Sequence, residues 1–163
     1  MKIFIYESSP QMQKLMLNSF LQKGFEVNAV SEKNLIIDAL LKKQYDVLIA
    51  DIAPNDAAEI NILKTIKSES KTTNIKVIIH SQNITKEFML SMMKIGITFF
   101  ISKPYIEKPF FNKFMDLLKK ENITVVERKF ARIKPMPGDN AAMLLRSSVN
   151  FKIYSFKILD ISL

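Results

Sequence analysis

Five short apolar runs, rich in β-branched residues, recur along residues 3–101, and segments with helical periodicity separate them. Apolar runs without strict alternation are typical of parallel strands that are buried on both faces of a sheet. Strands that alternate with helices form right-handed βαβ units. The pattern therefore predicts an α/β fold with helices on both faces of five parallel strands, in the order 2-1-3-4-5. The predicted strands are Ile3–Tyr6, Phe25–Val30, Asp46–Ala50, Ile75–Ile79 and Ile97–Ile101.

The segments between these runs carry helix signals. Gly24 and Gly96 are expected to end the first and fourth helices, because glycine adopts the left-handed conformation of a helix C-terminus at little cost. A third helix is predicted over Ala57–Ser68, and the inner stripe of the second helix should include Leu35. Helix starts are predicted at Ser8 or Ser9, Ser31, Thr85 and Pro109.

Composition narrows the class of protein. The chain has no cysteine, which excludes a disulfide framework and a thiolate metal site. The N-terminal MKIFIY is too short for the apolar core of a signal peptide, and no run approaches the ~20 apolar residues of a membrane span. We therefore expect a cytoplasmic protein.

The net charge of +8 is unevenly distributed. Residues 122–163 hold seven Lys or Arg and three Asp or Glu, so this quarter of the chain carries +4 of the total. A local basic excess favours an anionic partner, although solvated lysine faces give the same statistics.

Polar residues follow four of the predicted strands, and ligands of open parallel sheets bind at the carboxyl ends of the strands. There Asp51 could act as a nucleophile that accepts a phosphoryl group. Lys103 and the Ser81 hydroxyl would bind the phosphoryl oxygens. A divalent cation would lie between Glu7 and Asp51. The strand-end residues are Glu7 and Ser8, then Asp51, then His80 and Ser81, and finally Lys103 and Pro104.

These residues resemble those of the response-regulator receiver family, which has a flavodoxin-like fold. The similar segments are YESSP at 6–10, VLIAD at 47–51, VIIHS at 77–81, and Gly96 through the Lys-Pro-Tyr at 103–105. The resemblance covers residues 1–120, and we assign residues 1–121 to a receiver domain and 122–127 to a linker. It implies that Phe100 is a switch residue that pairs with Ser81. It also allows a cis Lys103–Pro104 peptide bond.

The resemblance implies a signal-transduction protein that accepts a phosphoryl group on Asp51 from a histidine kinase or phosphotransfer protein. The family usually has a second acid where this chain has Ser8, so only weak Mg²⁺ binding is expected. Gln82 stands where a small residue is usual and could crowd the pocket. The alternative is a degenerate receiver that docks or dimerises without phosphorylation.

An interaction surface is expected on the face of the fourth helix, fifth strand and fifth helix, and a homodimer could form there. Six bulky residues crowd this region, too many for a single core, so some should form an exposed patch. They are Phe99, Phe100, Ile101, Tyr105, Phe110 and Phe111.

The tail carries a second resemblance. Arg128 and Arg132 form an Arg-x-x-x-Arg motif, and Asp160 and Ser162 follow in LDISL. Together they are similar to the start of the PilZ family, a small β-barrel that binds cyclic di-GMP through such arginines. Residues 128–163 would then be an incomplete PilZ-like segment with only about the first two strands of the barrel, and the two predicted strands are Ala141–Arg146 and Phe151–Leu163. Because a two-stranded ribbon is only marginally stable and cannot hold the binding residues rigidly, we expect the 163 residues to bind cyclic di-GMP poorly.

Other classes of function are disfavoured. The tail lacks the periodicity of a helix-turn-helix output, so a nucleic-acid partner is not expected. No Gly-rich phosphate loop, nucleophile elbow or histidine-centred triad is present, and we do not expect an enzyme. His80, the single histidine, is expected to pack or face solvent near a strand end without a functional role.

Overall fold

The computed structural model describes the backbone of residues 1–121, 123, 132–133, 142–146, 153–157 and 161–162, with side chains for 1–121 and 123. Five strands form one parallel sheet in the order β2-β1-β3-β4-β5, which confirms the predicted fold and strand order. The strands are β1 (Lys2–Tyr6), β2 (Glu26–Val30), β3 (Val47–Asp51), β4 (Lys76–Ser81) and β5 (Phe99–Ser102).

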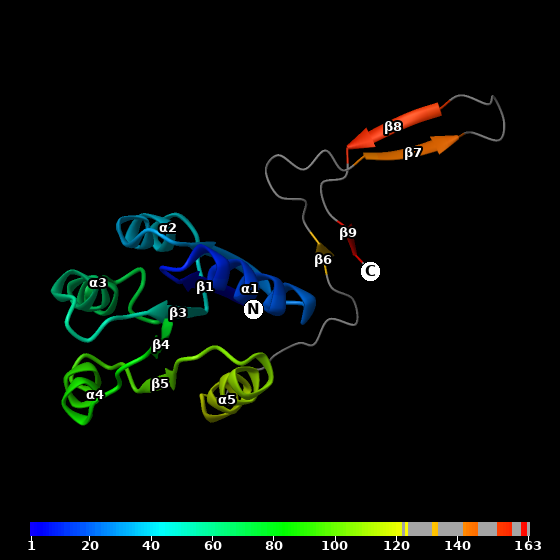
Figure 1. Cartoon of the computed structure of the whole chain (residues 1–163). Coiled ribbons are helices and arrows are strands. Elements are labelled where there is room, and N and C mark those ends of the chain that lie inside the picture. Colours follow the sequence, from blue (N-terminus) through cyan, green and yellow to red (C-terminus); the bar gives the residue numbers. More distant parts are fainter. Residues whose placement is uncertain (122, 124–131, 134–141, 147–152, 158–160, 163) are drawn as a thin grey trace.

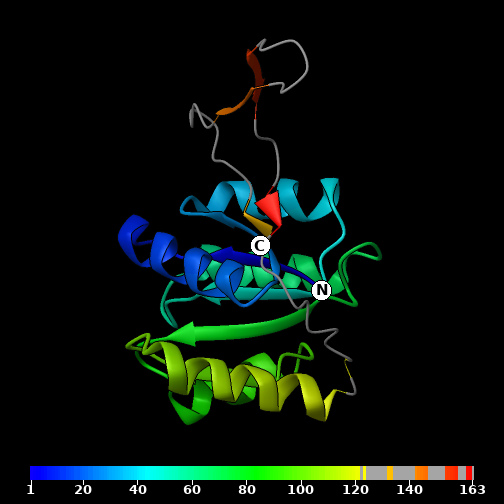
Figure 2. The ribbon, with the colours of Figure 1, turned by 90° about the vertical axis from the view of Figure 1, so that its right-hand side faces the viewer.

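Helices cover both faces of this sheet. Figure 1 shows α1 and α5 on one face and α2, α3 and α4 on the other, and Figure 2 shows α1 and α5 from the front. The helices are α1 (Pro10–Gln22), α2 (Ile36–Lys42), α3 (Ala57–Ser68), α4 (Lys86–Met93) and α5 (Glu107–Lys120), and a short 3₁₀ turn, η1 (Lys33–Leu35), precedes α2. None of the described helices combines the length and the apolar character that crossing a membrane requires.

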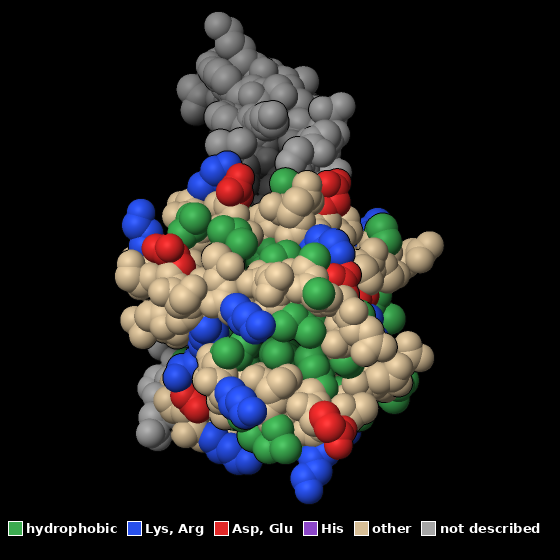
Figure 3. All heavy atoms as spheres, turned by 90° about the vertical axis from the view of Figure 1, so that its left-hand side faces the viewer, with side chains coloured by type: hydrophobic (Ala, Val, Ile, Leu, Met, Phe, Trp, Pro, Cys, Tyr) green, Lys and Arg blue, Asp and Glu red, His purple; other side chains and the backbone are tan. Residues whose placement is uncertain are grey.

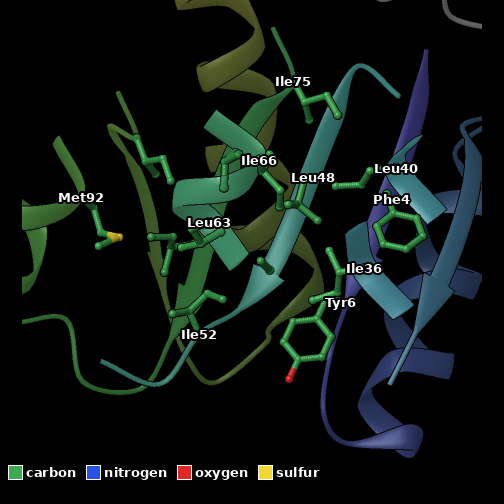
Figure 4. Packing of buried hydrophobic residues seen from close by; sticks show 14 of the residues in the cluster. Phe4, Tyr6, Ile36, Leu40, Leu48, Ile52, Leu63, Ile66, Ile75 and Met92 are labelled. Carbon is green, nitrogen blue, oxygen red and sulfur yellow. The ribbon is translucent and has the colours of Figure 1, made fainter. Parts of the chain in front are cut away.

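Each sheet face has its own hydrophobic core because successive strand residues point to opposite faces. Phe4 and Tyr6 of β1 pack into the core under α2, α3 and α4, which Figure 4 shows with Leu48, Leu63 and other labelled residues. Ile3 and Ile5 pack instead under α1 and α5. In that second core several aromatic rings meet edge to face, as do Phe20 and Phe114, whose ring centroids are 5.0 Å apart.

Most helix ends follow the predicted signals. Ser9 caps α1 by accepting a hydrogen bond from the backbone N–H of Met12, and Thr85 caps α4 in the same way. Gly24 and Gly96 both have φ of 80°, the left-handed conformation that favours glycine. The Lys103–Pro104 peptide bond is cis.

Two predicted helix starts were wrong. Ser31 caps no helix, because the 3₁₀ turn intervenes before α2, and Leu35 of that turn is 44% exposed and not part of the inner stripe. Helix α5 begins at Glu107, two residues before Pro109, because proline is tolerated throughout the first turn, where backbone N–H groups have no intrahelical acceptor.

The predicted exposed aromatic patch was also wrong. Phe99, Phe100 and Phe111 are half-buried against the two cores, and the other three of the six side chains are buried. Five of the six pack in or against the core under α1 and α5, and only Phe100 packs against the core on the other face, so a single core takes up most of them. The large apolar side chains exposed in this region are instead Leu90 and Met93 of α4, and Ile106. Figure 3 shows the face of α2, α3 and α4, where hydrophobic side chains lie among lysines.

The described parts of the tail are two antiparallel strand pairs. Strand β7 (Ala142–Arg146) pairs with β8 (Ile153–Lys157), and β6 (Arg132–Ile133) pairs with β9 (Ile161–Ser162). The predicted second strand, Phe151–Leu163, thus contains two separate strands with different partners.

Candidate functional site

The predicted site residues lie at one edge of the sheet. Glu7 directly follows β1, Asp51 ends β3, and Lys103 directly follows β5. Asp51 pairs in register with His80, and the backbone N–H of Lys103 donates to the carbonyl of Ser81 at 2.9 Å. Because all the strands are parallel, their carboxyl ends bring these residues together although the sequence separates them widely.

Lys103 lies between two carboxylates. Its Nζ is 2.8 Å from Oδ1 of Asp51 and 3.2 Å from Oε1 of Glu7. Glu7 is buried, whereas the side chains of Asp51 and Lys103 are 14% and 24% exposed. We refer to the side chains of Glu7, Asp51 and Lys103 as the cluster. The formal charges of its one ammonium and two carboxylates sum to −1, which favours a further cation.

Asp51 is held at both carboxylate oxygens. The Ser8 hydroxyl donates to Oδ2 at 2.6 Å while Lys103 binds Oδ1. Burial raises the pKa of Asp51. The hydrogen bonds from Lys103 and Ser8 lower it by more than burial raises it, so the pKa lies below its ordinary value of 3.8. Burial lowers the pKa of Lys103, but the hydrogen bond to Asp51 outweighs it and the net pKa is raised. At neutral pH this pair is therefore a carboxylate and an ammonium.

Neither Ser81 nor Phe100 contributes a side-chain hydrogen bond to the cluster among the described residues. The Ser81 side chain is buried, and its Oγ has no hydrogen-bond partner among the described residues. Phe100 is half-buried and meets the edge of Phe88 at 6.3 Å between ring centroids. The Ser81 hydroxyl thus has no partner among the described residues, while the backbone of Ser81 accepts a hydrogen bond from the backbone of Lys103.

The cluster borders a cavity of about 310 Å³. Gln82 forms part of its wall, at the place where the sequence predicts crowding. Met12 and Tyr105 contribute apolar surface, while Glu7 and His80 lie on its buried side. The space beside Lys103 is therefore open enough for a small group to enter.

The residues present fit a weak magnesium site. Glu7 and Asp51 supply hard oxygen donors, and one oxygen of each lies within 3.2 Å of the same Lys103 ammonium. Within residues 1–121 and 123, however, no group of three His, Cys, Asp or Glu side chains could enclose a metal ion. Mg²⁺ commonly keeps several waters and binds through one or two carboxylates, which is what Glu7 and Asp51 could provide.

Sequence reasoning missed Glu59 as a residue that supports the site. Its carboxylate accepts hydrogen bonds of 2.7 Å from the Tyr6 hydroxyl and from the backbone N–H of Ala53, so it ties β1 to the loop after Asp51. Burial and the hydrogen bond to Glu59 raise the pKa of Tyr6. The spacing of Asp56 and Glu59 is that of a capping box, the sequence signal that could have drawn attention to Glu59.

His80 is the second residue whose place the sequence did not indicate. Of the two expected arrangements, packed or solvent-facing, the structure shows the packed one. The buried ring lies against Glu7. Its Nδ1 is 3.6 Å from Oε2 of Glu7, and both side chains are 1% exposed.

The predicted cyclic di-GMP residues are only partly described. Arg128 and Asp160 lie outside the described residues. Arg132 and Ser162 are direct register partners in the antiparallel pair of β6 and β9. The backbone thus brings the first and last parts of the tail motif together.

Comparisons with known proteins agree with this architecture. The model of the response regulator receiver domain family matches residues 3–114. The chemotaxis protein CheY4 of Vibrio cholerae is 15% identical, with a TM-score of 0.63 over 73% of this chain and 96% of that chain. A response regulator from Desulfuromonas acetoxidans is 17% identical, with a TM-score of 0.64 over 73% and 97% of the two chains. The signal receiver domain of a DNA-binding response regulator from Colwellia psychrerythraea is 20% identical, with a TM-score of 0.62 over 73% and 98%. No curated protein matches the sequence.

Proposed function

Because this chain belongs to the response-regulator receiver family, we propose that Asp51 accepts a phosphoryl group from a histidine kinase or a histidine phosphotransfer protein. The observation that carries the proposal is the position of Lys103, with its ammonium 2.8 Å from Asp51 at the carboxyl edge of the sheet. A half-buried carboxylate beside an ammonium that itself lines a cavity is suited to nucleophilic attack on phosphorus.

In the proposed reaction a carboxylate oxygen of Asp51 attacks the phosphorus of a phosphohistidine. The P–O bond forms as the P–N bond breaks, and the departing imidazole keeps the bonding electrons and takes up a proton. Lys103 turns toward the phosphoryl oxygens and neutralises their charge. The free hydroxyl of Ser81 donates to another phosphoryl oxygen, and Phe100 follows Ser81 as the switch residue.

Glu7 and Asp51 would hold Mg²⁺ in this scheme. When bound, the cation would neutralise charge on the acids and on the phosphoryl group. Ser8 donates a hydrogen bond to Asp51 and adds no negative charge, so the expected affinity is low.

We expect the wild-type protein to gain the mass of one phosphoryl group when it is incubated with acetyl phosphate and Mg²⁺. Omitting Mg²⁺, or adding EDTA, should slow the reaction, because Glu7 and Asp51 then keep their full repulsion toward the anionic donor. Intact-protein mass spectrometry measures the product, and beryllofluoride tests the same pocket without a transfer step. If neither reagent modifies the protein or perturbs its spectrum, the domain acts by docking alone.

Docking without phosphorylation has its own support. Both oxygens of Asp51 already have hydrogen-bond donors, and Leu90, Met93 and Ile106 expose apolar surface around α4 and the start of α5. A homodimer through the face of α4, β5 and α5 is the corresponding arrangement. Analytical ultracentrifugation measures the mass of the protein in solution. We expect the wild type to sediment as a dimer and Leu90→Glu to sediment as a monomer.

We also propose that the tail contributes to a cyclic di-GMP site that the receiver domain regulates. The register pairing of Arg132 with Ser162 supports this, since it puts two residues of the motif opposite each other on paired strands. We expect at most weak binding by the 163 residues alone, because a two-stranded ribbon is only marginally stable. Calorimetry on this chain and on a longer form of the protein, with Arg132→Ala and the control Arg146→Ala, measures it. Binding that is indifferent to Arg128→Ala and Arg132→Ala would make the PilZ resemblance a coincidence.

A further inference from the structure

Glu7 and His80 form a buried polar pair next to Lys103. Both side chains are 1% exposed. Oε2 of Glu7 and both ring nitrogens of His80 have no hydrogen-bond partner among the described residues. A buried polar atom without a partner is costly, so an explanation is needed for three of them in one place.

The surroundings of His80 restrict its ring. The imidazole meets the Phe110 ring edge to face at 5.1 Å, with an interplanar angle of 87°, and the Tyr105 ring at 6.3 Å. On the backbone, His80 pairs in register with Asp51 on one side and Ile101 on the other. Two aromatic rings and two neighbouring strands therefore hold the ring at this position.

The two oxygens of Glu7 have different surroundings. Oε1 receives the Lys103 ammonium at 3.2 Å and the backbone N–H of Ser9 at 3.3 Å. Oε2 faces Nδ1 of His80 at 3.6 Å. This separation exceeds the usual N–H···O range of about 2.7–3.2 Å by a few tenths of an ångström, a gap that a small torsional change in either side chain closes.

We propose that His80 is a positioning residue whose Nδ1–H donates to Oε2 of Glu7 and so holds Oε1 toward Lys103 and the cation position. In proteins that bind metal ions, a donor behind a carboxylate ligand fixes the orientation of that ligand and raises its effectiveness. His80 would supply this support in a pocket where Ser8 replaces an acid. The effect on the cation rests on the proposed function, whereas the contact between His80 and Glu7 does not.

The contact is tested by long-range ¹H–¹⁵N NMR of the imidazole in the metal-free protein. His80 is the single histidine of the chain, so its two ring nitrogens are assigned without ambiguity. We expect a proton on Nδ1, and Glu7→Gln should shift the Nδ1 resonance. The matched control is Glu107→Gln, which removes a carboxylate on the surface, beside Lys23, and should leave that resonance unchanged. An imidazole with its proton on Nε2 alone would overturn the proposal.

The consequence for the cation is tested by titrating Mg²⁺ into two variants and following backbone amide shifts. His80→Leu should weaken Mg²⁺ binding ~10-fold or more, whereas His80→Asn, which keeps an N–H donor near the place of Nδ1, should stay within ~3-fold of wild type. Equal effects of the two substitutions, or none, would show that His80 does not position Glu7. If wild type itself binds no Mg²⁺, the metal part of the proposed function fails, and the imidazole spectrum still decides the contact.

Discussion

Asp51→Asn is expected to abolish phosphorylation of this chain by acetyl phosphate or by a phosphohistidine donor. An amide oxygen carries no full negative charge and the amide nitrogen is not basic, so neither atom replaces the carboxylate as a nucleophile. The substitution keeps the size of the side chain, and its amide can still accept a hydrogen bond from Lys103 or Ser8. Loss of the product would therefore report loss of the nucleophile and not collapse of the pocket. Intact mass after incubation with donor and Mg²⁺ measures it.

The matched control is Asp46→Asn, just before the opposite end of the same strand. Asp46 accepts a hydrogen bond from the backbone N–H of Lys2 at 2.6 Å, far from the carboxyl edge of the sheet. The same chemical change there should leave the yield of phosphorylated protein unaltered. A phosphoryl group that still appears on Asp51→Asn would show that another residue is the acceptor.

Lys103→Met is expected to separate phosphoryl transfer from cation binding. The ammonium of Lys103 bridges Glu7 and Asp51, and in the proposed reaction it turns to the phosphoryl oxygens. Removing one positively charged group that stabilises developing charge typically slows a reaction ~100-fold or more. The same substitution leaves two carboxylates without their counter-ion, so Mg²⁺ should bind at least as tightly as in wild type. A slower phosphoryl transfer with undiminished Mg²⁺ affinity is the diagnostic result.

Phosphorylation rates and Mg²⁺ titrations on Lys103→Met and on the exposed control Lys108→Met provide the measurement. Lys108 lies in the first turn of α5, outside the cluster, and its loss should change neither quantity by more than a small factor. If Lys103→Met is phosphorylated at the wild-type rate, the ion pair with Asp51 has only a structural role, and docking becomes the favoured function of the domain.

The sequence alone determined the order and type of the elements in the first 120 residues. Apolar runs of strand length, alternating with amphipathic helices, leave few arrangements other than a parallel sheet with right-handed crossovers. Local signals also placed several helix ends, because a capping hydroxyl such as Ser9 or Thr85, or a glycine such as Gly24, acts on its own neighbours. The convergence of Glu7, Asp51 and Lys103 could also be predicted, because the carboxyl ends of parallel strands lie at the same edge of the sheet.

Where sequence reasoning failed, the outcome depended on contacts between distant elements. Serine is a good helix cap by residue type, but a 3₁₀ turn lies between Ser31 and the start of α2. Six bulky side chains around β5 and α5 looked too many for one core, but five of them pack in or against the core under α1 and α5, and only Phe100 packs on the other face.

Only the tertiary structure decided which side chains of the site form hydrogen bonds and ion pairs with one another. Lys103 reaches Glu7 across 96 residues, and the Ser8 hydroxyl reaches Asp51 across 43. Glu59 binds the Tyr6 hydroxyl, and His80 faces Glu7 in a space closed by α5. Strand register and side-chain direction set such distances, and a shift of one residue in register would move each group to the other face of the sheet. Local preferences carry no information on that register, which is decided when the two cores pack.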